Sequence, residues 1–500
     1  MSDDKLEEKI TAPSDALPSE NASEERAHEK TETSRLQKFI SQFDKWGLEL
    51  NGIERILPEH RVQRSTRDTF TMWLGANCNV VTFSLGTLGS SVYKLGFRDS
   101  VIAIVVFNIL AIIPVAYFST FGARSGLRQL VFSRFAFGYW TCMIPGVLNM
   151  IACLGWATVN CIVGAQTIHA VSRTHPLPIW AGISILAILT LIPSFSGYKF
   201  VHVYERHSWI APMIIFFIIL GKGRKYMNAA RSDLTGNIEI ASVFSFGASV
   251  AGFSLSWISF AADYTVHLPE NTSSWKIFFA AFFGNLVPLV LIEILGAAMM
   301  TTLLKNPSWR DKYQSDGMGG LLSAGLSPLG GFGRFLTVLL GCSVANALYR
   351  TQKYSLALTV QTFGRRIAAI PRPLITMAGT AVIVTAALIG QAQFEAFLDT
   401  FLVFVGYWAM IFGVIVAQEH IIFRRSHWSN YAFEDVNNSK LLPPGFASGF
   451  ALVCGIVGAI LGMSQKWFTG PIARLLGPEK SGVDLGFQVS LIFTTMVCVC

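Results

Sequence analysis

The chain has 500 residues, of which 52% are hydrophobic and only 14% are charged, whereas soluble domains usually carry about 25% charged residues. A helix that crosses a membrane needs about 20 mostly apolar residues, and the chain has room for about twelve such helices. This composition excludes a string of soluble domains and predicts an all-α polytopic membrane protein. The formal charge of +8 does not indicate a nucleic-acid partner, because the basic residues lie in short loops without a stripe of interleaved aromatic residues.

The start of the chain differs sharply from the rest. Residues 1–35 are rich in Glu, Ser, Lys and Asp and contain almost no large apolar side chains, so they cannot bury enough surface to fold alone. The segment lacks the apolar core of a secretory signal. We therefore expect residues 1–65 to form a disordered cytoplasmic tail and residues 66–500 to form one transmembrane domain.

Apolar runs then follow at regular intervals, and we expect each of them to cross the membrane. With a cytoplasmic N-terminus, most basic loops face the cytoplasm, as the positive-inside rule requires. One loop disagrees, because Lys222, Arg224, Lys225 and Arg231 would face outwards. The expected spans are residues 69–92, 99–121, 139–171, 178–196, 208–221, 244–264, 276–304, 334–362, 373–391, 396–422, 445–464 and 485–500.

Two of these spans contain small residues that weaken a helix. The first span holds the run Gly-Thr-Leu-Gly at 86–89, and the sixth holds Gly247 and Gly252, followed by three serines. Backbone groups freed in this way survive at membrane depth only where they line protein or a cavity. Interrupted helices at matching positions of two halves indicate a binding site between inverted repeats. Glycine also lets helices approach closely, so helix packing is an equal alternative.

Several motifs go beyond a generic membrane pattern. They are GARSGLRQ at 122–129, SRF and GY within 133–139, GWATVN at 155–160, GYK and HVYER within 197–206, and SLSW and AADYT within 254–265. In their order along the chain, from about Gly52 to the last span, these motifs resemble the nucleobase–cation symporter-1 family and most closely its fungal purine–cytosine permease branch.

The resemblance implies both a fold and an activity. The fold is the five-plus-five inverted repeat of the bacterial leucine transporter, with helices 1 and 6 broken. The activity is proton-coupled symport of nucleobases such as adenine, guanine, hypoxanthine and cytosine by alternating access. The family's usual location is the plasma membrane, so the expected partners are a nucleobase and the lipid bilayer.

An aromatic and amide pair suits this substrate. Trp156 and Asn160 stand four residues apart and therefore share one helix face. A tryptophan ring stacks on a base, and an amide offers a donor and an acceptor to its polar edge. Trp257 of the sixth span could supply a second ring. Tryptophan in a span is otherwise often an interfacial anchor and asparagine often joins helices, but the resemblance implies substrate contact for all three.

Five further residues are candidates for binding, gating or coupling. Thr82, and after it Asn79, are expected to approach the substrate, although a threonine hydroxyl can instead bond to a carbonyl one turn earlier. The resemblance implies a gating or coupling role for Glu205, which by spacing alone reads as a surface carboxylate paired with a neighbouring base. Asp263 is a second gating candidate at the end of the sixth span. Glu293 lies inside the seventh apolar run, where ionisable residues are costly and often functional.

The eighth span departs from the family pattern. Relatives carry Ala-Asn-Asn-x-Pro-Asn-x-Tyr-Ser, whereas this chain reads ANALYRTQKYS at 345–355, two residues longer and without the proline. Asn346 clearly remains and is expected to contact the substrate. Arg350 and Lys353 add two charges, each costing at least ~2.5 kcal/mol near the bilayer centre. A changed substrate, lost transport and a misplaced intron boundary all remain open.

Other functions also remain open. The chain could be a symporter for allantoin, uracil or a pyridoxine-like ring, or a receptor-like paralogue that does not transport. An enzyme is not expected, because HExxH, P-loop and serine-hydrolase motifs in a matching context are missing. The cysteines are scattered without metal-binding spacing. We therefore expect no metal and no cofactor, and the resemblance implies a proton as the coupling ion. The oligomeric state cannot be read from the sequence.

Overall fold

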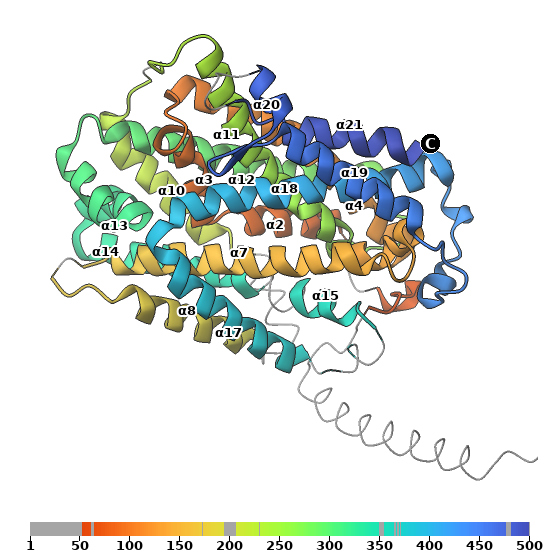
Figure 1. The fold of residues 1–500 in the computed structure, drawn as a ribbon. Helices are drawn as coiled ribbons and strands as arrows, with labels where there is room; N and C mark the ends of the chain where they lie inside the picture. The colour runs from red at the N-terminus through yellow and green to blue at the C-terminus, as the bar shows by residue number, and fades with distance from the viewer. Residues whose placement is uncertain are drawn as a thin grey trace, which may run out of the picture. The chain divides into compact units, whose positions relative to one another are not determined.

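The computed structural model describes residues 53–499, except for 62–64, 173, 195–206, 230, 350–354, 365–366, 368–369, 371 and 477–481. Helices dominate this part of the chain, and β1 (Ser464–Gln465) and β2 (Phe468–Thr469) form a short antiparallel pair. The helices of the first half, shown in Figure 1, are η1 (Pro58–His60), α2 (Thr66–Asn77), α3 (Val80–Ser91), α4 (Phe97–Ser125), α5 (Gln129–Phe132), α6 (Arg134–Phe137), α7 (Met143–His169), α8 (Ile179–Ser194), α10 (Ile210–Gly223), η2 (Arg224–Tyr226), α11 (Asn237–Leu255) and η3 (Ser256–Tyr264).

The second half continues with long helices joined by short ones. Its helices are α12 (Ser274–Thr302), α13 (Pro307–Leu326), η4 (Ser327–Leu329), α14 (Gly330–Tyr349), α15 (Ala357–Gln361), α17 (Arg372–Gly390), η6 (Gln391–Gln393), α18 (Phe394–Gln418), η7 (Glu419–Phe423), η8 (Trp428–Asn430), η9 (Phe433–Asn437), α19 (Phe446–Gly462), α20 (Pro471–Leu476) and α21 (Gly486–Val499). Each range expected to span the membrane overlaps at least one of these helices.

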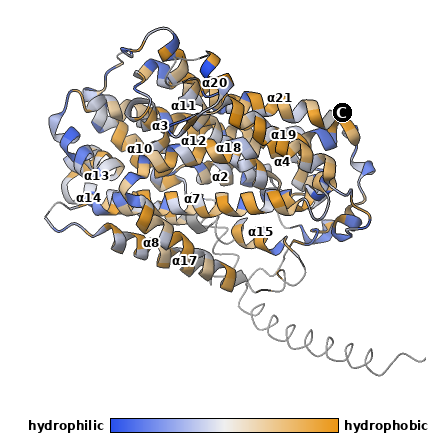
Figure 2. Cartoon of the chain, in the orientation of Figure 1, coloured by the Kyte–Doolittle hydropathy of each residue, from blue (hydrophilic) through white to orange (hydrophobic). Residues whose placement is uncertain are grey.

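The surface of these helices is suited to lipid. Large apolar side chains are exposed on them, for example Ile188 at 61% and Ile389 at 77%, and hydrophobic colour runs along α8, α17 and α21 (Figure 2). Extended apolar surface of this kind marks a membrane contact. The chain is therefore an all-helical integral membrane protein. The helical segments of the described residues that are long and apolar enough to cross a membrane are Phe97–Ser125, Met143–His169, Asn237–Tyr264, Ser274–Thr302, Pro307–Ala345 and Leu374–Phe423, beside three shorter apolar helices.

Three sets of helix contacts position the centre of the molecule. Helix α12 packs against α2, α3 and α4, and α7 packs against α8, α14 and α17. Helix α18 packs against α11 and α21. Residues that lie far apart in the sequence are thus brought together around α7, α11 and the paired helices α2 and α3.

Helix packing explains the glycines that were expected to interrupt the spans. A Cβ atom at Gly86 would stand 1.9 Å from the backbone oxygen of Glu293, and one at Gly252 would stand 2.2 Å from that of Leu402. Both glycines therefore allow two helices to approach backbone to backbone. The helix α3 continues through residues 86–89, so the prediction of a break at that run is wrong.

The breaks occur elsewhere in the same two spans. In the first span, α2 ends at Asn77 and α3 begins at Val80, and Asn79 caps α3 by accepting hydrogen bonds from the backbone nitrogens of Val81 and Thr82 at 2.9 and 3.2 Å. Such a cap satisfies donors that the start of a helix leaves free. In the sixth span, α11 gives way at Ser256 to the 3₁₀ helix η3. A 3₁₀ stretch inside a longer helix often marks a hinge.

The segment before the first span lies against the end of α4. The backbone nitrogen of Ile56 donates to the oxygen of Gly126 at 2.9 Å, and Arg55 bonds to both the Ser125 oxygen and the Glu434 carboxylate. Residues 1–52 and 62–64 of the expected tail lie outside the described residues. The tail therefore stays a prediction.

Candidate functional site

The candidate site centres on one face of α7. Trp156 is buried, and its ring meets Phe253 of α11 and Phe401 of α18 edge-on, with centroids 4.9 and 5.2 Å apart. Asn160 lies one turn further along, where its Nδ2 donates to the backbone oxygen of Trp156 at 2.8 Å. Its Oδ1 is buried and has no hydrogen-bond partner among the described residues. A buried acceptor left unpaired costs about 1–3 kcal/mol, so this oxygen is suited to a ligand donor.

Trp257 of the sixth span shares a hydrophobic cluster with α7. It packs against the cluster of Cys153, Phe260 and Leu356, and Cys153 lies one turn before Trp156 on α7. A residue of α7 close to Trp156 therefore belongs to the cluster on which the second predicted tryptophan packs. The indole Nε1 of Trp257 donates to Oδ1 of Asn77 at 3.2 Å.

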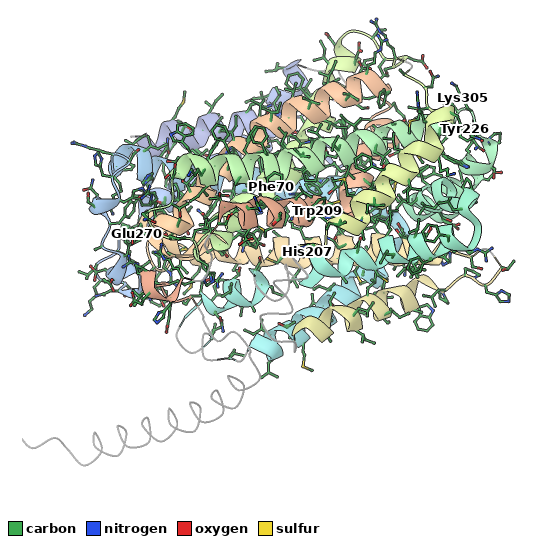
Figure 3. All side chains as sticks on the ribbon, turned by 180° about the vertical axis from the view of Figure 1, so that it is seen from behind. Phe70, His207, Trp209, Tyr226, Glu270 and Lys305 are labelled. Carbon is green, nitrogen blue, oxygen red and sulfur yellow. The ribbon has the colours of Figure 1, made fainter. Side chains whose placement is uncertain are left out.

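Asn77 connects the two interrupted spans to α12. Besides accepting from Trp257, its Nδ2 donates to Oδ1 of Asn285 at 2.8 Å. The break after Asn77 also lies beside the start of α10, since the Sγ of Cys78 is 3.5 Å from the backbone oxygen of Trp209, a residue labelled in Figure 3. Asn77 was not among the predicted site residues. The feature of the sequence that marks it is its position directly before the break in the first span.

The side chains of Thr82 and Asn79, the two candidates of the first span, form hydrogen bonds to backbone groups at the break between α2 and α3. The hydroxyl of Thr82 donates to the backbone oxygen of Asn77 at 2.6 Å, and the Nδ2 of Asn79 donates to that of Ala76 at 2.8 Å. Both side chains are buried. In this conformation they hold the broken backbone in place beside the site, and their contact with a substrate stays a prediction.

A second amide on α7 was missed by the sequence analysis. Asn149 lies seven residues before Trp156 and therefore on the same helix face. Its Nδ2 donates to the hydroxyl of Thr359 in α15 at 2.7 Å, and its Oδ1 is buried without a partner among the described residues. The spacing to Trp156 was the signal that could have found it.

Asp263 joins the end of the sixth span to the segment after α4. Its Oδ1 accepts a hydrogen bond from the backbone nitrogen of Gln129 at 2.7 Å. The side-chain amide of Gln129 is fully buried, and neither of its polar atoms has a partner in the described part of the chain. This arrangement is compatible with the expected gating role of Asp263.

A different carboxylate ties the first, sixth and tenth spans together. The Oδ1 of Asp399 in α18 accepts hydrogen bonds from the hydroxyls of Tyr93 and Ser249, both at 2.7 Å. Tyr93 follows α3, and Ser249 belongs to α11. The sequence did not single out Asp399, because one carboxylate at the start of a span reads as a solvent-exposed residue.

Two predicted site residues cannot be placed in this geometry. Glu205 lies outside the described residues, as do Arg350 and Lys353. Asn346 belongs to α14, but its side chain lies outside the described part. The roles of Glu205 and Asn346 therefore stay predictions.

Comparison with known proteins matches most of the chain to one family. A family model described as "Permease for cytosine/purines, uracil, thiamine, allantoin" matches residues 56–477. The chain is 41% identical over 471 residues to the purine-cytosine permease fcyB of Emericella nidulans, and the aligned region covers 93% of this chain and 90% of that permease. It is 38% identical over 467 residues to the purine-cytosine permease FCY2 of Saccharomyces cerevisiae, covering 92% and 87% of the two chains.

The fold agrees with a solved transporter structure. Mhp1, a nucleobase-cation-symport-1 family transporter in a closed conformation with bromovinylhydantoin bound, superposes with a TM-score of 0.64 at 16% identity, covering 90% of this chain and 95% of Mhp1. The expected family is thereby confirmed, as is the expectation that the protein is a transporter and not an enzyme. This chain belongs to the family of permeases for cytosine/purines, uracil, thiamine and allantoin, the nucleobase–cation symporter-1 family.

Proposed function

We propose that this protein carries purines and cytosine across the plasma membrane by proton-coupled symport and alternating access. The proposed substrates are adenine, guanine, hypoxanthine and cytosine. The observation that carries the proposal is the buried Oδ1 of Asn160, which has no hydrogen-bond partner among the described residues and belongs to a side chain one turn from Trp156 on α7. The names of fcyB and FCY2, both purine-cytosine permeases, support this substrate class.

The chemistry of these side chains matches a planar base with a polar edge. Each proposed substrate carries an N–H group in its ring system or attached to it, which can donate to the Oδ1 of Asn160. The ring of Trp156 offers a stacking surface, and stacking on an aromatic side chain contributes about 1–3 kcal/mol per base. Trp257 supplies the second ring, and Asn346 of α14 supplies a second amide. Asn79 and Thr82 hold the broken first span beside them.

The proposed architecture has about twelve spans in a five-plus-five inverted repeat. Its two broken helices are the first span, α2 with α3, and the sixth, α11 with η3. Their separation by five spans supports the repeat, as does the superposition on Mhp1. The N-terminus, including the tail of residues 1–65, is proposed to face the cytoplasm, with Glu205 and Asp263 in coupling and gating.

The altered sequence at 345–355 favours a second candidate. A segment that lacks the family's proline and carries two added charges would suit a different small ring, such as allantoin, uracil or pyridoxine. The same charges would also be expected in a receptor-like paralogue that does not transport. Competition of allantoin, uracil or pyridoxine with cytosine for uptake would distinguish a carrier of these rings from a purine and cytosine carrier. A receptor-like paralogue would be distinguished by the absence of any uptake.

The proposal is tested by uptake of radiolabelled cytosine and adenine in cells that lack their own carriers. Uptake is expected to be saturable, to collapse when a proton uncoupler is added, and to disappear in Asn160→Ala. The same substitution at Asn237, an exposed residue at the start of α11, is the matched control and should leave uptake unchanged. A correctly localised protein that takes up neither base would contradict the proposal.

A further inference from the structure

A carboxylate lies buried in the interior of α12. Glu293 has no exposed surface, and its helix runs between the positions of Glu270 and Lys305, which lie at opposite ends of it in Figure 3. The Oε2 of Glu293 accepts a hydrogen bond from Nδ2 of Asn108 in α4 at 2.7 Å. Its Oε1 has no partner among the described residues. An ionisable residue held inside a spanning helix, facing protein, is rarely retained without a function.

No positive charge in the described part of the chain neutralises this carboxylate. Glu293 forms no ion pair with the described residues. Gly86 of α3 lies close to the backbone oxygen of Glu293. A buried charge without a counter-ion is costly, whereas a carboxylic acid is neutral. The other lysine, arginine and carboxylate side chains of α12, of α4 and of the helices packed against these two stand near helix ends: Lys276 on α12, Arg67 and Asp68 on α2, Arg98, Asp99 and Arg124 on α4, Lys222 on α10, Glu239 on α11 and Asp263 on η3.

A chain of hydrogen bonds links Glu293 to the broken sixth span. Asn108 donates to Glu293 and accepts, through its Oδ1, a hydrogen bond from the hydroxyl of Ser254 at 2.7 Å. Both Asn108 and Ser254 are buried. Ser254 is the second-last residue of α11, directly before the 3₁₀ helix η3 begins at Ser256. The carboxylate therefore lies two hydrogen bonds away from the point where this span changes its helix type.

We propose that Glu293 binds and releases the coupling proton, and that Asn108 and Ser254 pass its protonation state to the broken helix. This inference rests on the proton-coupled symport proposed above. A proton from water on one side of the membrane forms an O–H bond on the carboxylate. The same bond breaks after the conformational change, and the proton leaves to water on the other side.

The amide of Asn108 gives this step a mechanical consequence. A carboxylate only accepts, so Asn108 presents its Nδ2 to Glu293 and its Oδ1 to Ser254. A proton on Oε2 turns the carboxyl into a donor, and the amide must then turn over to present its Oδ1 to Glu293. Its Nδ2 then faces Ser254, whose oxygen accepts and whose hydroxyl hydrogen must find another acceptor at the end of α11. Protonation thereby changes the hydrogen bonding at the hinge.

The test uses the full-length protein in liposomes, with labelled cytosine and an internal pH indicator. The wild type should take up protons together with cytosine and should transport faster under an inward proton gradient. In Glu293→Gln, exchange of internal for external cytosine should persist, while proton uptake is lost and transport is the same with and without the gradient. Glu239→Gln, the same change near the start of α11, is the matched control and should behave like the wild type.

The outcomes separate this inference from the proposed function. Cytosine transport by the wild type without proton uptake would overturn both. Proton uptake that is equal in the wild type and in Glu293→Gln would overturn the role of Glu293 alone. Should Glu293→Gln fail to fold, Asn108→Ala keeps the carboxyl and removes a donor to its ionised form. The pH at which transport is half-maximal should then rise, and an unchanged pH profile would contradict the inference.

Discussion

The indole Nε1 of Trp257 donates a hydrogen bond to Oδ1 of Asn77 across 3.2 Å. Asn77 is the last residue of α2, and Trp257 is the second residue of η3, so the bond joins the two spans at the points where each is interrupted. Trp73 supports it, because its ring meets that of Trp257 edge-on at 5.3 Å. A base that stacks on Trp257 therefore acts on both broken helices at once.

The hydrogen bond between Trp257 and Asn77 predicts that Trp257→Phe transports cytosine more slowly. Phenylalanine keeps an aromatic ring but cannot donate to Asn77. A hydrogen bond of this kind contributes about 0.5–1.5 kcal/mol, so the maximal rate of cytosine transport should fall by roughly twofold to tenfold, with a smaller change in KM. Initial rates across a range of cytosine concentrations separate the two constants. A variant whose rate is unchanged would show that the bond does not couple the helices.

The ring of Trp156 should matter for affinity. Trp156→Ala removes a stacking surface worth about 1–3 kcal/mol, so the Kd for cytosine should rise by roughly fivefold to a hundredfold, while Trp156→Phe should retain most of the affinity. Binding to the purified protein gives the Kd directly. Trp180→Ala is the control, since Trp180 is a tryptophan with 61% exposure on α8. Equal losses in both alanine variants would argue against stacking on Trp156.

The carboxylate of Asp399 should stabilise the conformation seen here. Tyr93→Phe and Ser249→Ala each remove one of the two hydroxyl donors at 2.7 Å, and hydrogen bonds to charged groups contribute about 1.5–3 kcal/mol. Each variant should therefore melt at a lower temperature in detergent. Because the two hydroxyls also lie within hydrogen-bond distance of each other at 3.0 Å, losing either one weakens the other's bond as well, so the double variant should lose less than the sum of the two. Strict additivity would mean that the two bonds act independently.

Asp484, in the loop before α21, predicts a dependence of stability on pH. Burial raises the pKa of this carboxyl above its ordinary value of 3.8, although Tyr407 and Gln465 and two backbone nitrogens donate to it. A raised folded-state pKa means that the unfolded chain loses the proton first. The stability contributed by the protonated group is thus complete below the ordinary value and is lost as the pH rises through the folded-state pKa.

Asp484→Asn should therefore flatten the fall in melting temperature between acidic and neutral pH. Thermal melts of the purified variant and the wild type across that range measure the two slopes. Glu434→Gln, at a residue of the exposed ion pair with Arg55, serves as a control for a general loss of negative charge. If the wild type and Asp484→Asn have the same slope, Asp484 is not the group responsible.

The sequence predicted the helices well and the breaks poorly, for different physical reasons. A long apolar run is stable in lipid whatever its neighbours in the fold are, so the ranges of the spans can be predicted from local composition alone. Gly86 looks like a helix breaker, but its role depends on Glu293 more than 200 residues away, whose backbone it allows to approach. The true break at Cys78 and Asn79 depends on Asn285 and Trp257, which only the folded chain brings to Asn77.

The candidate site shows the same division. Trp156 and Asn160 could be found because their spacing alone puts them on one face of a helix. Asn149 could have been found by its spacing to Trp156, whereas Asn77 and Asp399 could not, because an isolated polar residue in a span looks the same whether it joins helices or binds a ligand. These roles are separated only by the partners that the fold brings near, or by a buried oxygen that has no partner within the described residues, such as Oδ1 of Asn149.

Binding of labelled cytosine to the purified, full-length protein tests the central claim most directly. The wild type should bind cytosine saturably, adenine should compete, and Asn160→Ala should lose binding while Asn237→Ala retains it. Cytosine binding by Asn160→Ala with the wild-type Kd would contradict the account. Binding that pyridoxine or allantoin displaces and adenine does not would contradict the proposed substrate class.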